Sequence, residues 1–356
     1  MKIVVKVGTQ SILSSDGRPL ESVLTDLVKQ IVKILQNGHK IVLVSSGAVG
    51  FGRSVVRQML KREYGKSIGE KQVLASLGQH ELMHVYAQIF NQHNMLVSQL
   101  LLTKQDFHTR QHYLNITRLL FEILSNDNII PIVNENDSVA IKELMFTDND
   151  ELAGLIAAQI NADKLIILSN VEGVYTGHPS DQDSKLIPII DPKNDWPQVS
   201  SSKSTHGRGG MVSKISTARK MSGLGITTHI ASINQYDVLT KLIGGDMLGT
   251  IILPSKKKST IKRWIAYNTW QATGSITIND CLYKILKENK HVVSILPVGI
   301  TLYAGDFKRG DPVDIIAPDH KKIGIGLARY DSNKLRELCG QKNNSAFIHY
   351  DHLHIF

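Results

Sequence analysis

The sequence predicts an α/β protein with a large domain on a largely parallel open sheet, followed by a small β-rich domain. Three observations predict this class. Over residues 1–253, short runs rich in Ile, Val and Leu alternate with longer segments of helical period. A polar and basic break follows Pro254. Beyond residue 274 the apolar runs become shorter and are punctuated by turns that contain glycine and aspartate.

Six segments in the first part have the composition of strands, most of them apolar on both faces. They are Lys2–Val7, Lys40–Ser45, Met95–Leu101, Ile129–Asn134, Lys164–Ser169 and Thr227–Ser232. Between the first two, apolar residues from Leu20 to Leu35 recur at helical spacing, and Gly38 follows as a stop signal. This order predicts a crossover helix between parallel strands.

The length of 356 residues is large for one hydrophobic core and predicts two domains. The run Ser255–Ser259 contains three consecutive lysines between apolar segments, as an interdomain linker would. We therefore predict a first domain over residues 1–254, a linker over 255–273 and a second domain over 274–356. For the second, we expect a small β-rich barrel with one or two helices.

Composition excludes several classes of protein. The apolar runs are strand-sized, so no membrane-spanning segment is expected, and the N-terminal segment lacks the pattern of a signal peptide. We expect a cytoplasmic protein. Only two cysteines occur, Cys281 and Cys339, which argues against a disulfide framework or a zinc site. None of the 14 histidines has the spacing of a metal motif.

The net charge of +9 is concentrated in the C-terminal part, where 16 lysines and arginines stand against 9 acids from Ser255 onward. A basic domain of this kind keeps RNA binding open as an alternative function.

Two glycine-containing segments could bring backbone N–H groups to an anion. The first, Ser45–Gly50, follows a predicted strand and is alternatively an ordinary strand-to-helix turn. The second, Gly207–Lys214, precedes the helical stretch Ile215–Leu224 and has the character of a phosphate site at a helix N-terminus. Alternatively, it is a surface loop with incidental charges. Neither has the Walker A pattern, which argues against a P-loop fold.

Lys6 lies in an apolar strand, where an unpaired buried ammonium would be costly. We expect it to face an anion at the end of the strand. The alternative is a side chain whose stem reaches solvent.

A dense polar cluster follows the middle strand, in the loops 134–137 and 146–150. Their acids and amides suit a zwitterionic ligand, since carboxylates receive an ammonium and amides orient a carboxylate. Asp148 or Asp150 could also cap the helix expected from Leu152 to Ile160.

Together these motifs resemble the glutamate 5-kinase family of the amino acid kinase superfamily. The matching segments are Lys6–Thr9, Ser45–Val49, Pro131–Asp137, Asp148–Asp150 and Gly209–Lys214. In the C-terminal part, Ile295–Ile300 and Gly305–Asp311 resemble a PUA domain. The resemblance covers essentially the whole chain.

The resemblance implies an α/β/α sandwich that uses ATP and Mg²⁺ to phosphorylate the γ-carboxylate of L-glutamate. The product would be γ-glutamyl phosphate, the first intermediate of proline biosynthesis. The residues carried over for catalysis are Lys6 and Lys214, which would stabilise phosphoryl charge, and Asp150, which would hold both lysines. Those carried over for glutamate are Ser46, Gly47, Asn134, Asp137 and Asn149. Those carried over for the nucleotide are Lys6, Ser169, Asn170, Arg208, Gly209, Gly210, Met211, Val212, Ser213 and Lys214. No protein ligand of the metal is assigned.

The chain departs from the usual family pattern at Thr147, at Ser169-Asn170, at Arg208 and, in the C-terminal domain, at Asn279–Leu282. The second and third departures bear on nucleotide preference. The resemblance further implies a homodimer or homotetramer and a hand-over of product to γ-glutamyl phosphate reductase. A kinase for another acidic amino acid remains the alternative among enzymes.

Overall fold

The computed structural model describes residues 1–14, 17–65, 67–107, 110–139, 146, 148–179, 181, 183–194, 196–197, 210–255, 272–288 and 293–355. The chain divides into two compact units, one formed by Met1–Asp106 with Asn115–Lys257 and the other by Phe107–Leu114 with Lys258–Phe356. Most of the predicted linker lies outside the described residues, so its boundaries at 254 and 274 stay a prediction.

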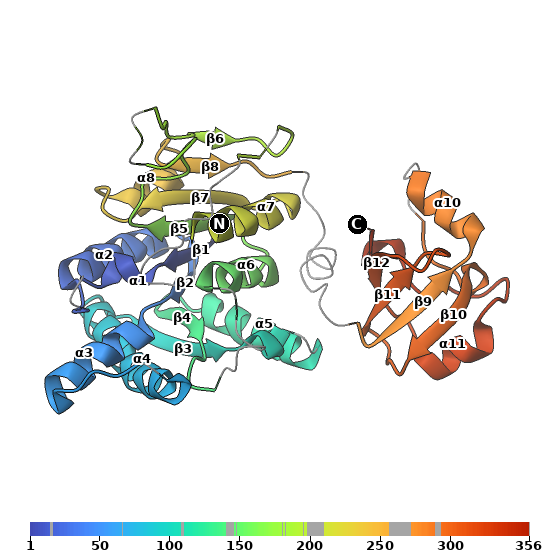
Figure 1. Cartoon of the computed structure of the whole chain (residues 1–356), viewed down its shortest axis with the longest axis horizontal. Coiled ribbons are helices and arrows are strands. Elements are labelled where there is room, and N and C mark those ends of the chain that lie inside the picture. Colours follow the sequence, from blue (N-terminus) through green and yellow to red (C-terminus); the bar gives the residue numbers. More distant parts are fainter. Residues whose placement is uncertain are drawn as a thin grey trace. The chain divides into compact units, whose positions relative to one another are not determined.

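An eight-stranded sheet with the order β3-β4-β2-β1-β5-β7-β8-β6 forms the centre of the first unit (Figure 1). Its strands are β1 (Lys2–Val7), β2 (Lys40–Ser45), β3 (Leu96–Leu102), β4 (Ile129–Glu135), β5 (Lys164–Ser169), β6 (Ile189–Ile190), β7 (Thr227–Ser232) and β8 (Thr250–Ile252). The pairs from β3 to β7 are parallel, whereas β7 and β8 are antiparallel. The predicted α/β class with a largely parallel sheet is confirmed.

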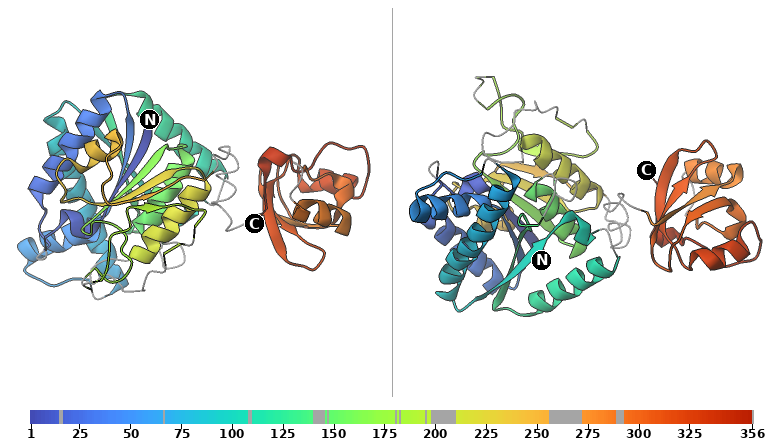
Figure 2. Two further views of the ribbon diagram at one scale, coloured as in Figure 1. Left: turned by 90° about the horizontal axis from the view of Figure 1, so that it is seen from above. Right: turned by 60° about the horizontal axis from the view of Figure 1, so that its bottom comes forward.

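Helices cover both faces of this sheet (Figure 2). They are α1 (Thr9–Ile12), α2 (Glu21–Gln36), α3 (Ala48–Leu60), α4 (Ile68–Asn91), α5 (Arg110–Ser125), α6 (Asn149–Gln159), α7 (Met211–Gly223) and α8 (Val238–Gly244). On one face, α2, α4 and α8 pack on the apolar side chains of β1 that include Ile3 and Val5. On the other, α6 packs against β1 and against α7. Among the described residues, no helix is long and apolar enough to cross a membrane.

The six predicted strands all exist, with ends that differ by at most a residue or so from the predicted ones. Strands β1, β2, β4 and β5 are buried almost throughout, as their composition predicted. Strand β3 is largely accessible because it forms the edge of the sheet. The short strands β6 and β8 have no predicted counterpart, because two or three residues carry no readable period.

The parallel order brings the carboxyl ends of four strands to one edge of the sheet. Val7 of β1 pairs with Ser45 of β2 on one side and with Leu168 of β5 on the other. Strand β4 lies next to β2, with Val133 opposite Val44. Residues that follow these strands, although far apart in the sequence, therefore meet at one site.

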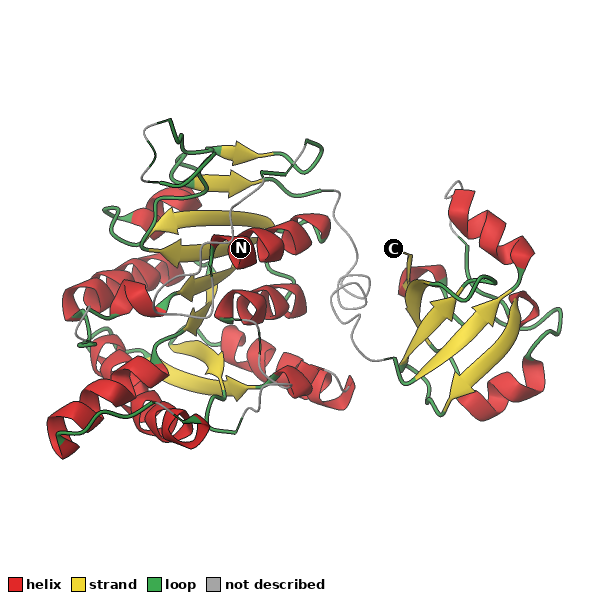
Figure 3. Cartoon of the chain, viewed as in Figure 1, coloured by secondary structure: helices red, strands yellow, loops and turns green. Residues whose placement is uncertain are grey.

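In the described residues from 272 onward, the second unit contains a five-stranded sheet with the order β10-β9-β11-β12-β13 and the helices α10 (Asp280–Glu288) and α11 (Ser332–Leu338) (Figure 3). Its strands are β9 (Gly274–Ile278), β10 (Ile300–Gly305), β11 (Pro312–Ile316), β12 (Lys322–Leu327) and β13 (Leu353–Ile355). Its core is its own, built around Phe307, Phe347 and Ile315. Cys281 and Cys339 are unpaired thiols. The predicted β-rich character of this part is confirmed.

Candidate active site

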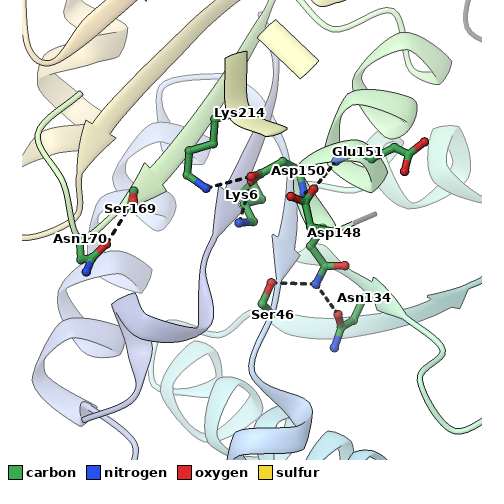
Figure 4. A network of polar contacts seen from close by, with 10 residues as sticks. Lys6, Ser46, Asn134, Asp148, Asp150, Glu151, Ser169, Asn170 and Lys214 are labelled. Atoms are coloured by element: carbon green, nitrogen blue, oxygen red, sulfur yellow. Dashed lines mark hydrogen bonds and ion pairs between the residues drawn. The ribbon is translucent and has the colours of Figure 1, made fainter. Parts of the chain in front are cut away.

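A buried carboxylate holds two buried lysines at the carboxyl edge of the sheet (Figure 4). Asp150, in the first turn of α6, lies 2.7 Å from Lys6 Nζ through one oxygen and 2.9 Å from Lys214 Nζ through the other. Asp150 is fully buried, and both lysines are almost so. The structure thus brings together the three residues predicted for catalysis, from β1, α6 and α7. Lys6 does not reach solvent, so the alternative of an exposed ammonium is wrong.

The charges of this triad explain its protonation. Burial alone would raise the pKa of the Asp150 carboxyl, but the two ammonium groups outweigh it and hold that pKa below its ordinary value. Burial lowers the pKa of Lys6 even though the Asp150 charge opposes this. Two lysines thus share one carboxylate at the carboxyl edge of the sheet. Such a cluster is suited to a ligand that brings further negative charge.

Local backbone structure places the two lysines. Lys6 precedes the end of β1. A Cβ at Gly8 would stand 3.6 Å from Lys6 Nζ, so the glycine leaves space beside the ammonium. Lys214 lies in the first turn of α7, whose N-cap Gly210 supplies no side chain to the first N–H groups. Met211, Val212 and Ser213 form the first turn with Lys214. Helix α7 thus begins at Met211, earlier than the predicted start at Ile215, and its first N–H groups belong to the segment predicted as a phosphate site.

Asp148 caps α6, as one of the two readings of this acid predicted. Its side chain accepts hydrogen bonds from the backbone N–H groups of Asp150 at 2.9 Å and Glu151 at 3.1 Å. Burial, together with the Asp150 charge, raises the pKa of Asp148. The cap fixes the first turn of α6 and therefore the position of the Asp150 carboxylate.

A chain of amides lies beside the triad (Figure 4). Asn149 Nδ2 donates to Ser46 Oγ and to Asn134 Oδ1, both at 2.8 Å. Asn134 Nδ2 donates in turn to Gln79 Oε1 of α4, also at 2.8 Å. Three of the residues predicted to bind the amino acid are therefore connected. Gln79 was not predicted, because nothing in its helical segment marks a site.

Gly47 is the turn between β2 and α3. Its φ of 114° lies in the left-handed region that favours glycine, and it is the N-cap of α3. The segment Ser45–Gly50 is therefore a strand-to-helix turn that opens at the amide chain. Asp137, the remaining residue predicted for the amino acid, lies in the turn after β4 and lines a small cavity of about 10 Å³ with Gln79 and Glu135.

Ser169 ends β5 and Asn170 follows it, on the other side of β1 from the amide chain. Asn170 Nδ2 donates to Gln10 Oε1 at 3.4 Å, and Ser169 Oγ lies 3.4 Å from Asn170 Oδ1. Both residues thus border the β1–α1 turn that carries Gly8. Arg208, Gly209 and Thr147 lie outside the described residues.

The described residues include no group of three acids, histidines or cysteines that could hold a metal ion. Asp150 already pairs with two lysines, and Asp148 caps a helix. The donor set therefore does not fit a metal cage made by the protein alone. A magnesium ion that enters with the oxygens of a nucleotide needs few protein ligands.

Comparison with known proteins identifies both units. The amino acid kinase family model matches residues 1–232, and the PUA domain model matches residues 274–346. Glutamate 5-kinase of Chlorobaculum tepidum is 43% identical in an alignment of 356 positions that covers 99% of this chain and 97% of that protein. Glutamate 5-kinase of Bacteroides thetaiotaomicron is 41% identical in an alignment of 358 positions that covers 99% of this chain and 98% of that protein. The resemblance found in the sequence is confirmed, and the chain belongs to the amino acid kinase family, with a PUA domain in its C-terminal part.

Proposed function

We propose that the protein transfers the γ-phosphoryl group of ATP to the γ-carboxylate of L-glutamate, the first step of proline biosynthesis. The observation that carries this proposal is the side-by-side arrangement of the lysine–aspartate triad and the amide chain in a protein related throughout its length to glutamate 5-kinases. The triad suits phosphoryl charge, and the amides suit an amino acid.

In the proposed reaction, a γ-carboxylate oxygen of glutamate attacks the γ-phosphorus of ATP, and the bond from that phosphorus to the bridging oxygen breaks. The products are γ-glutamyl phosphate and ADP. No general base is needed, because a carboxylate with a pKa of about 4.3 is already ionised at neutral pH. Catalysis then consists of alignment and charge stabilisation.

Each predicted residue has a place in this reaction. Lys6 and Lys214 stabilise the charge on the transferring phosphoryl group, and Asp150 holds both. The amino acid contacts are assigned to Ser46, Gly47, Asn134, Asp137 and Asn149. The nucleotide contacts are assigned to Ser169, Asn170 and the segment from Arg208 to Lys214. We propose ATP as its magnesium complex, with the metal held chiefly by phosphate oxygens.

Two further proposals concern partners. An acyl phosphate hydrolyses readily in water, so we propose that a γ-glutamyl phosphate reductase consumes the product. We also propose that the protein acts as a homodimer or homotetramer in the cytoplasm.

A substrate panel tests the proposed activity. The protein is incubated with ATP, Mg²⁺ and hydroxylamine, which traps acyl phosphates as hydroxamates, and ADP is measured in parallel. L-Glutamate should give hydroxamate at least about tenfold faster than L-aspartate, because the shorter side chain leaves its carboxylate out of line. Acetylglutamate and carbamate serve as further acceptors. Equal rates with aspartate would contradict the substrate assignment.

The alternative of RNA binding as the main function rests on the basic C-terminal part and is tested by a gel shift. Salt-sensitive retention of RNA by a protein that releases no glutamate-dependent ADP would favour it.

A further inference from the structure

The hydrogen bonds of the amide chain run in a single donor-to-acceptor direction, and one backbone group fixes that direction. The backbone N–H of Glu135 lies 2.8 Å from the Asn134 side chain, and a backbone N–H can only donate. The atom it meets must therefore be Asn134 Oδ1. The other side of the same amide, Nδ2, then points to Gln79, which must present its oxygen.

The donors and acceptors on the Asn149 side of Asn134 are fixed in the same way. Asn134 Oδ1 also accepts from Asn149, which must present Nδ2 there. Asn149 Nδ2 uses its second hydrogen on Ser46 Oγ, so the serine accepts and keeps its own proton to donate. What is left over is Asn149 Oδ1, a buried acceptor with no hydrogen-bond partner among the described residues.

We propose that Gln79 is a positioning residue for the amino acid substrate. Gln79 accepts a hydrogen bond from Asn134 and so fixes which atoms of the amide chain donate and which accept. In this arrangement Asn149 Oδ1 is presented to the substrate ammonium and the Ser46 hydroxyl to a carboxylate. This inference rests on the proposed function and adds a residue from α4 to it. Gln79 acts through Asn134 and Asn149.

The burial of Gln79 supports this role. Its side chain is 7% exposed, so the bond to Asn134 does not compete with bulk water. Its Nε2 has no partner among the described residues, and the residue lines the small cavity together with Glu135 and Asp137. An amide turned the other way would set an NH₂ group against Asn134 Nδ2, and that contact would be repulsive.

Helix packing holds Gln79 in place. Its neighbour Gly78 lies so close to α3 that a Cβ there would overlap the carbonyl oxygen of Ala48 and the backbone nitrogen of Gly52. Gln79 is thus carried by a backbone that contacts the first turns of α3, directly after Gly47. Helix α4 therefore orients Asn134 through Gln79 and also contacts the start of α3, directly after the turn that carries Ser46.

The test compares Gln79→Met with Gln79→Glu. Methionine has a similar shape but no acceptor, whereas glutamate keeps an acceptor for Asn134 in either protonation state. Gln30→Met is the matched control, because Gln30 is also buried and accepts from the backbone N–H of Leu239 at 2.8 Å, far along the chain from the site. Folding of each variant is checked by circular dichroism. Should Gln79→Met not fold, Gln79→Leu, which is smaller and also lacks an acceptor, replaces it.

We expect Gln79→Met to raise KM for L-glutamate about tenfold, because the hydrogen bond from the substrate ammonium to Asn149 Oδ1 would be lost. KM for ATP should stay within about twofold. The ratio of the inhibition constant of glutarate, which lacks only the ammonium, to KM for L-glutamate should fall by a similar factor. Gln79→Glu should recover most of this ratio, and Gln30→Met should leave it unchanged.

An unchanged ratio in Gln79→Met, parallel increases in both KM values, or the same loss in Gln30→Met would overturn the inference. The proposed function is judged separately, on the unaltered protein. If that protein forms no hydroxamate from L-glutamate, the proposed function fails. If it does, and Gln79→Met behaves like it, only the role of Gln79 fails.

Discussion

The carboxylate of Asp150 contacts two ammonium groups in a place that water does not reach. A single residue thereby determines the charge of the whole site. Its removal would leave two buried cations close together without a counter-charge, which is costlier than the loss of one surface ion pair.

Asp150→Asn should therefore lower the stability by about 3–5 kcal/mol at neutral pH, as the breaking of buried ion pairs commonly does. Because the folded-state pKa of Asp150 is lowered, its contribution is fully present above the ordinary carboxyl pKa of about 4 and is lost as pH falls through the folded-state pKa. The melting temperatures of the two proteins, followed by circular dichroism, should thus converge toward acid pH. A gap that stays constant into strong acid would contradict this description.

We propose that Asp137 contacts the amino acid substrate and not the phosphoryl group. Asp137→Ala should raise KM for L-glutamate about tenfold or more, because a carboxylate that meets the substrate ammonium would be lost. KM for ATP should change little. Steady-state kinetics with each substrate varied in turn measures both values, and Asp319→Ala, an exposed acid of the second unit, is the control. An increase in KM for ATP alone would instead indicate that Asp137 contacts the nucleotide.

Helix α4 carries Gln79 and packs against α3, which follows β2 at the carboxyl edge of the sheet. Helix α4 begins at a capping box, in which Ser67 accepts from the N–H of Glu70 and the Glu70 side chain accepts from the N–H of Ser67. The S-x-x-E pattern of such a box is visible in the sequence and could have predicted this start. The close contact between the helices depends on glycines, which a search for apolar periods does not detect.

Gly78→Ala should destabilise the protein by about 1–3 kcal/mol, since the added methyl group overlaps the α3 backbone and forces the helices apart. It should also raise KM for L-glutamate, because Gln79 moves with α4. Gly69→Ala on the same helix is the matched control. Nothing lies within 4 Å of a Cβ there, so the change should be neutral or slightly stabilising. Urea unfolding measures both, and equal effects of the two substitutions would contradict the packing argument.

Elements and site were predictable to different degrees, for physical reasons. Strands such as Lys2–Val7 were found because burial on both faces selects a continuous apolar run, and Asp148 because caps have a local signature. The triad was located by its family motifs, whereas its contacts required the fold. Gln79 could not be found, since its role depends on Asn134, a residue 55 positions away along the chain.

At the scale of the whole molecule, the two units have separate cores. Among the described residues, the core cluster of the first unit around Val5 and Leu27 contains residues of that unit, and the cluster around Phe307 contains residues of the second. Every residue assigned to the reaction lies before Pro254. A cut near Ser255 removes the PUA domain and leaves Phe107–Leu114 of the second unit joined to the first.

A protein that ends near Ser255 should fold cooperatively and still form γ-glutamyl hydroxamate, with kcat within a few-fold of the full chain. Thermal unfolding shows whether it folds, and the hydroxamate assay measures its activity. A folded but inactive truncated protein would mean that the PUA domain shapes the site or its assembly.

We propose that Lys214, held by Asp150, stabilises the charge of the transferring phosphoryl group. A double-mutant cycle on kcat for L-glutamate tests it most directly. Lys214→Ala and Asp150→Ala should each lower kcat about a hundredfold or more with smaller changes in KM, as the loss of a preorganised charge does. The double variant should be far less impaired than the product of the two losses, because the pair acts as a unit. If Lys214→Ala instead raises only KM for ATP and leaves kcat intact, the lysine is a ground-state nucleotide contact and the claim is wrong.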